Sequence, residues 1–159
     1  MKYRQLTKEQ FSELHKEFAE FLATQQIDAK EWNKIKEEKP SVAEEELNIF
    51  SDVVWEGVLS KTEYLEHISV NDINLFKCNS EEIIRIYIKL KDKNKSFLST
   101  DDFQWFLKNP LDEDFEYFKA EKKYAKDRNL ELFELIEMGS QISKGELFTA
   151  ISQLIGQRL

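Results

Sequence analysis

The stretch from Asp92 to Asp102 carries oxygen-bearing side chains at the close spacing of a calcium-binding loop. An EF-hand loop needs oxygen ligands at positions 1, 3, 5 and 12 and a glycine at position 6. With Asp102 at position 12, the first three ligand positions are lysines: Lys91, Lys93 and Lys95. If one residue of the loop is left out of the alignment, oxygen-bearing side chains fall at positions 1, 3 and 5, but the glycine at position 6 is still missing. We therefore expect no metal and no cofactor, and a degenerate EF-hand-like regulator remains only an alternative.

A six-residue pattern that includes the end of this stretch occurs four times. It reads apolar, then Ser, Thr or Asp, two residues, an acid or Gln, and apolar. The second positions are Thr7, Asp28, Ser99 and Ser143. A Ser, Thr or Asp at the N-cap with an acid or amide three residues later satisfies the first amides of a helix. The four copies thus predict four capped helix starts.

The other residue types that carry chemistry give weak signals. His15 and His67 lack the Glu-x-x-His spacing of a di-iron site and are interpreted as surface or edge residues. Cys78 has no histidine near it in the sequence and is expected to be a small buried side chain. The 31 acids are mostly expected on solvated helix faces. No catalytic residue is assigned, and an enzyme with an assembled carboxylate or thiol site stays an alternative.

Helices are expected to surround these residues at both ends of the chain. Apolar side chains at steps of three and four predict helices over 7–24, 28–38, 41–59, 101–108, 112–126, 130–138 and 144–155. Helix 41–59 is apolar nearly all round, so it is expected at the centre of the fold. We predict an α+β protein, a mostly helical single domain over 1–159. Its helical parts are 7–59 and 101–156, and its small antiparallel sheet is 62–98.

The sheet is expected to contain strands 62–69, 73–78 and 83–91. In the last of these, apolar residues alternate strictly with polar ones, which is typical of a half-buried strand. The side chains expected to face water form a possible interaction surface: Arg85, Tyr87, Lys89, Lys91 and Lys93. Such lysines could instead protect an edge strand from pairing. In that case the interface would be sought among Trp32, Trp55 and Trp105.

Composition limits the partners of the protein. Lys and Arg number 23 and Asp and Glu 31, so the net charge is −8, which argues against nucleic acid as a general partner. No apolar run exceeds three residues, which argues against a membrane. One cysteine in 159 residues is typical of a reducing, cytoplasmic location.

Three stretches together resemble one known family: Met1–Gln10, Phe21–Trp32 and Phe50–Leu59. The likeness continues through Glu63–His67 and more loosely through Gly145–Leu147. The family is a domain-of-unknown-function family of short, acidic, uncharacterised bacterial proteins. The resemblance implies a bacterial cytoplasmic protein and supplies no catalytic residues. We therefore expect a non-catalytic protein–protein interaction module, acting on a partner protein or by self-association.

Overall fold

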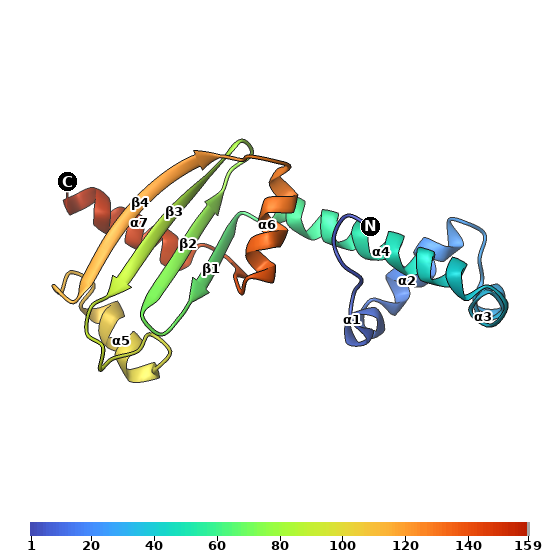
Figure 1. The fold of residues 1–159 in the computed structure, drawn as a ribbon, viewed down its shortest axis with the longest axis horizontal. Coiled ribbons are helices and arrows are strands. Elements are labelled where there is room, and N and C mark those ends of the chain that lie inside the picture. Colours follow the sequence, from blue (N-terminus) through green and yellow to red (C-terminus); the bar gives the residue numbers. More distant parts are fainter. Residues whose placement is uncertain (159) are drawn as a thin grey trace. The chain divides into compact units, whose positions relative to one another are not determined.

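The computed structural model describes residues 1–158, apart from the side chains of residues 157 and 158 (Figure 1). The chain forms two compact units, Met1–Ser60 and Lys61–Leu159. Each unit is described by itself. The α+β class and the antiparallel sheet are confirmed, whereas the expectation of a single domain stays a prediction.

The first unit consists of helices packed around aromatic side chains. The helices are α1 (Lys8–Glu13), α2 (His15–Ala23), α3 (Ala29–Glu38) and α4 (Pro40–Lys61), the last of which ends one residue into the second unit. Phe50 of α4 is buried, and its ring centroid lies 5.0 Å from Phe18 and 5.4 Å from Phe21. Phe18 also meets Trp32 edge-on at 5.3 Å. These contacts join α2, α3 and α4 through one aromatic cluster.

Two expectations for this unit are wrong. The helix expected over 7–24 is divided, because Leu14 leaves helical geometry at φ −102° and ψ 21°. Helix α4 is not covered on all sides, because Ile49 and Val53 are 44% and 56% exposed. Its apolar side chains are spread around the helix, but only one face packs against the aromatic cluster, so the helix is not at the centre. Helix α4 begins at Pro40, one residue before the expected start, because a proline at the first helical position has no amide to leave unpaired.

The second unit is built on a five-stranded antiparallel sheet of order β4-β3-β2-β1-β5. Its strands are β1 (Tyr64–Ile68), β2 (Asp72–Cys78), β3 (Glu82–Leu90), β4 (Phe115–Lys123) and β5 (Gln141–Ser143). Its helices are α5 (Thr100–Lys108), α6 (Arg128–Glu137) and α7 (Glu146–Arg158). No helix among the described residues is long and apolar enough to cross a membrane.

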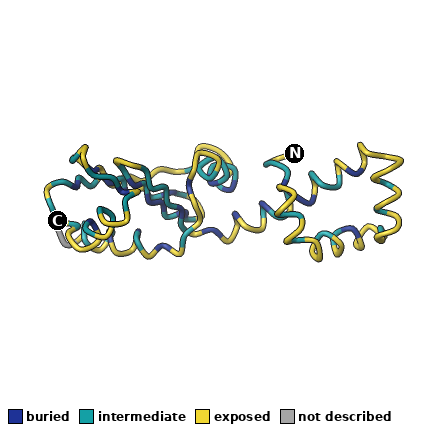
Figure 2. Tube along the Cα trace, turned by 90° about the horizontal axis from the view of Figure 1, so that it is seen from below, coloured by how far each residue is buried: buried dark blue, intermediate teal, exposed yellow. Residues whose placement is uncertain are grey.

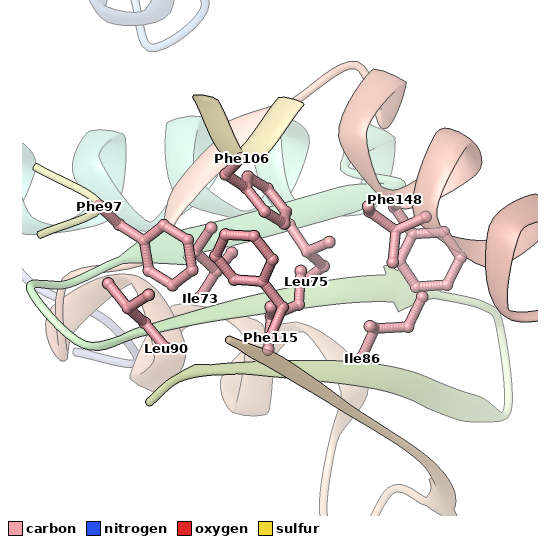
Figure 3. Packing of buried hydrophobic residues seen from close by; sticks show 10 residues of the cluster. Ile73, Leu75, Ile86, Leu90, Phe97, Phe106, Phe115 and Phe148 are labelled. Atoms are coloured by element: carbon pink, nitrogen blue, oxygen red, sulfur yellow. The ribbon is translucent and has the colours of Figure 1, made fainter. Parts of the chain in front are cut away.

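Alternating side chains of β3 define two faces of this sheet. The core face carries Ile86, Ile88 and Leu90, which join one buried cluster with residues of α5 and α7 (Figure 3). Within it the Phe106 ring lies 4.8 Å from Phe115 and 5.2 Å from Phe97. The outer face carries the odd-numbered residues of β3 from 83 to 89, and α6 covers only part of it. The buried segments of Figure 2 accordingly gather in the strands.

Two strands occur where helix or a helix start was expected. The stretch 112–126 contains β4, and 141–143 forms β5. Lys, Glu and Ala dominate the second half of β4, and these residues favour helix in isolation. Pairing overrides that preference, because Phe115 opposite Leu90 and Tyr117 opposite Ile88 complete the core face.

Three of the four expected helix caps are confirmed. Thr7 forms a reciprocal capping box with Gln10, while Asp28 and Ser99 each accept a backbone amide from three residues on. The fourth is wrong, because Ser143 lies in β5 and its Oγ accepts the amide of Gly145 at 3.1 Å. The next helix, α7, begins only at Glu146.

Gly145 is required by its backbone and by its neighbour. Its φ is +81°, and a Cβ at this position would lie 2.5 Å from ring carbons of Tyr64. We predict that Gly145→Ala lowers the free energy of unfolding by about 2–4 kcal/mol in urea denaturation. The matched control is Gly156→Ala, where a Cβ meets no atom within 4 Å. Because alanine favours helix over glycine, the control should gain about 0.5–1 kcal/mol. Equal urea midpoints for Gly145→Ala and wild type would contradict the prediction.

Candidate functional site

The residues expected to form an interaction surface lie on one face of the sheet and in the loop that follows it. Arg85, Tyr87 and Lys89 lie on the outer face of β3, and Lys91 and Lys93 come directly after the strand. Strand β3 pairs with β2 on one side and β4 on the other, so it is not an edge. The interpretation that these lysines protect an edge strand is therefore wrong. The suggested tryptophans offer less surface, since Trp55 is buried and the other two are half-buried.

Neighbouring strands place acids beside this basic group. Lys91 Nζ lies 3.3 Å from Glu116 Oε1, and the Tyr87 hydroxyl donates to Asp72 Oδ2 at 3.2 Å. Glu116 also lies directly opposite Lys89 in the β3–β4 register. The surface therefore carries both positive and negative charges, and it is less positive than the sequence of residues 85–95 alone indicates.

Arg85 is the cation of this group that the structure orients most firmly. Its Nε donates to Asn74 Oδ1 at 2.8 Å, and its guanidinium carbon lies 5.2 Å from the Tyr87 ring centroid. The Tyr87 ring in turn lies 6.0 Å from Phe118, which is 53% exposed. Within the described part of the chain, no carboxylate pairs with Arg85. Its two terminal nitrogens are thus held in place with their charge not neutralised.

A groove of about 770 Å³ lies between the outer face and α6, and Arg85 lines it. Its apolar lining comes from both sides: Phe76, Ile83, Ala120, Leu135 and Met138. Its polar lining is His67, Asn74, Arg85, Glu121, Lys122, Tyr124, Glu131, Glu134 and Ser140. The groove combines apolar walls with a few fixed polar groups, which is the usual make-up of a binding site.

Arg128 fixes α6 over the sheet. Its guanidinium donates to the backbone carbonyls of Thr62 at 2.6 Å, Cys78 at 3.1 Å and Asn79 at 3.0 Å. Its Nη1 also donates to Asn129 Oδ1 at 2.7 Å. These bonds connect the first turn of α6 to the segment before β1 and to the end of β2. These bonds hold the first turn of α6, the helix that forms one wall of the groove, against the sheet.

Two further contacts close the end of the groove where Arg128 lies. The Tyr124 hydroxyl donates to the Asn79 carbonyl at 2.9 Å, and burial raises the pKa of Tyr124 to about 12. Lys122 Nζ lies 3.5 Å from Glu131 Oε1, which joins β4 to α6. Tyr124 stays a neutral donor at physiological pH, so this contact does not change there.

The two histidines and the cysteine lie in different surroundings. His67 lines the groove and packs against Gly139, where a Cβ would lie 2.9 Å from its Nε2. His15 is exposed in the first unit, and its Nδ1 contacts the Ser12 carbonyl at 2.9 Å. Cys78 is buried, and that burial raises the pKa of its thiol to about 12. A thiolate nucleophile is therefore not populated at neutral pH.

The acids of the suspected calcium loop bind backbone amides. Asp92 Oδ1 accepts the amide of Asn94 at 2.9 Å, and Asp102 Oδ2 accepts that of Ser96 at 3.0 Å. Lys95 of the same loop lies 4.0 Å from the Trp105 ring centroid and 3.6 Å from Asp114. Among the described residues, no group of three or more His, Cys, Asp or Glu could hold a metal ion.

Sequence reasoning placed Arg85 and Tyr87 on the water-facing side but missed the groove beside them. Asn74 lies opposite Tyr87 in the register, a relation that strand pairing alone determines. Phe118 was missed because its stretch was expected to be helical. The α6 residues of the groove gave no signal in the sequence, since their position depends on Arg128.

Fold and site together define an α+β protein with a groove on the outer face of an antiparallel sheet. The chain belongs to the family of unknown function DUF6495, whose model matches residues 1–156. This match confirms the resemblance to a domain-of-unknown-function family. No curated protein and no solved structure matches the chain.

Removing Arg128 should detach the first turn of α6 from the sheet. We predict that Arg128→Ala lowers the free energy of unfolding by about 3 kcal/mol, since hydrogen bonds to charged groups contribute more than neutral ones. Arg128→Lys should retain only part of the stability that Arg128→Ala loses, because an ammonium group cannot bond several carbonyls in one plane. The control Arg85→Ala removes an exposed guanidinium and should change stability by less than about 0.5 kcal/mol. Chemical denaturation followed by circular dichroism measures all three, and equal losses for Arg128→Ala and the control would refute this role.

Cys78 should be inert in the folded protein. Its raised pKa predicts negligible reaction with a disulfide reagent at pH 8 and rapid reaction after unfolding. The folded state holds the thiol proton more tightly than the unfolded state, whose pKa is near the ordinary value of 9.0. The free energy of unfolding should therefore fall as the pH rises from 9.0 toward about 12. Fast labelling of the native protein at pH 8 would instead favour a thiol site.

Proposed function

We propose that this chain is a non-catalytic interaction module that binds an acidic segment of a partner protein along the groove of its second unit. The observation that carries the proposal is Arg85, an oriented guanidinium at the groove with no carboxylate partner among the described residues. Arginine binds carboxylates through two parallel hydrogen bonds, and this geometry supplies both energy and orientation.

The surroundings of Arg85 suit a partner with one carboxylate beside apolar side chains, because Glu121, Glu131 and Glu134 also line the groove and would repel further acids. One side of Arg85 opens on the walls formed by Phe76, Ile83 and Leu135. The other side leads to the exposed ring of Phe118. Aromatic residues and arginine are enriched where protein interfaces have their strongest contacts. An acidic residue at Arg85 with apolar neighbours in the groove would use both sides.

The thiol and two acids of the stretch 92–102 are engaged within the fold. The one thiol is held neutral by burial, and two of the three acids in the stretch 92–102, Asp92 and Asp102, accept backbone amides. These features support binding over thiol catalysis or a calcium response. The single cysteine supports a reducing, cytoplasmic location as part of the same proposal.

The test uses labelled peptides of defined chemistry. The probes are acetylated hexapeptides in which one Glu lies beside two leucines, each matched to the same peptide with Gln. Fluorescence anisotropy should show that Glu peptides bind more tightly than Gln peptides. Arg85→Ala should lower the affinity for Glu peptides about 10- to 100-fold, because a charge-assisted contact is lost. Arg85→Lys should be intermediate, because it keeps the charge and loses the paired geometry.

Lys108→Ala is the matched control, since it removes an exposed cation of α5 that neither lines the groove nor belongs to the expected interaction surface. It should change the affinity by less than about twofold at moderate salt, where distant surface charges are screened. The proposal fails if no Glu peptide binds, if Gln peptides bind equally well, or if Arg85→Ala binds like wild type.

A further inference from the structure

Strand β4 forms a long edge of the sheet, and nothing on its outer side pairs with it within the described residues. The strand has nine residues, and each residue from Phe118 to Lys123 is exposed. Figure 1 shows β4 as the outermost arrow of the sheet. An edge of this length is a template for another strand, because its outward amides and carbonyls lack partners in the sheet.

The ladder itself shows which residues of β4 point outward. The amide of Lys91 bonds to the Asp114 carbonyl at 2.8 Å, and the amide of Tyr124 bonds to the Glu81 carbonyl at 3.4 Å. Backbone pairing in an antiparallel ladder alternates along the strand. Even-numbered residues of β4 therefore bond to β3, and odd-numbered residues direct their backbone groups to the outer edge. The outward set is Tyr117, Lys119, Glu121 and Lys123.

Charge selects one partner and one register for this edge. We propose that two copies of this chain pair antiparallel through β4 about a twofold axis at Ala120. This register places Lys119 of each copy opposite Glu121 of the other and Tyr117 opposite Lys123, so opposite charges meet twice. Neither Lys119 nor Glu121 has an ion pair among the described residues. Cross-strand pairs of opposite charge stabilise a sheet, and like charges directly opposite destabilise it.

Neighbouring registers are less favourable. Centring the pair on Lys119 sets the two copies of that lysine against each other. Centring it on Glu121 sets two glutamates together and Lys119 against Lys123. In the register about Ala120, the aliphatic stem of Lys122 lies opposite Phe118, which is 53% exposed. Ala120, Glu121 and Lys122 also line the groove, but the pairing depends on the backbone and charges of the sheet edge, so it does not rest on the function proposed above.

The experiment exchanges the two charges singly and together in the full chain. Wild-type protein should show a concentration-dependent dimer in sedimentation equilibrium. Lys119→Glu and Glu121→Lys each create two like-charge pairs across the axis and should each raise the dimer dissociation constant about tenfold or more. The double variant Lys119→Glu/Glu121→Lys restores opposite charges and should dimerise like wild type. Lys108→Glu changes the net charge as Lys119→Glu does, on α5 and not on β4, and should have little effect on the dimer dissociation constant.

Hydrogen exchange supplies a readout of the pairing itself. The amides of residues 119 and 121 should gain protection as wild-type concentration rises, whereas those of 118 and 120 should be protected at every concentration. The proposal is overturned if wild type is monomeric at its highest soluble concentration. It is also overturned if the single variants dimerise like wild type, or if the double variant stays as weak as the single ones.

Discussion

Every second side chain of β3 packs into the interior of the second unit, and every second amide of that strand bonds to β4. Both alternations follow from the two-residue period of an extended chain, and together they fix the geometry of the unit. Ile86 and Ile88 must face the helices of the core side, so Arg85 and Tyr87 must face the opposite way. The same period determines which residues of β4 present their backbone at the outer edge. A slip of one residue would bury Arg85 and expose the isoleucines, so the register is strongly specified.

The sequence predicts those parts of the fold that depend on local chemistry. The alternation of residues 83–91 identifies β3, and the side chains of Thr7, Asp28 and Ser99 identify three helix starts, because each signal lies within a few residues. Strand β4 shows the limit of this reasoning. The residues of its second half favour helix, and they become a strand because β3, more than twenty residues earlier, offers a ladder and an apolar surface.

The groove could not be predicted from local sequence patterns for a related reason. It needs α6 above the outer face, and that position is fixed by bonds from Arg128 to carbonyls about fifty and more residues earlier in the chain. The sequence around residue 128 does not indicate those hydrogen-bond partners. The register that places Asn74 and Asp72 beside β3 is likewise a property of the paired strands. The water-facing side of β3 could be predicted, whereas its neighbours could not.

Arg85 and Arg128 of the second unit differ in how far their guanidinium groups are bonded within the fold. Arg128 has its guanidinium donors engaged by three carbonyls and an amide oxygen, so its bonding capacity is spent within the fold. Arg85 has one nitrogen bonded to Asn74 and one flank against Tyr87, and neither neighbour is an anion for it. An amide orients a guanidinium without neutralising it. Although the chain has 31 acids, none of the described carboxylates pairs with Arg85, so its positive charge is not neutralised within the described part of the fold.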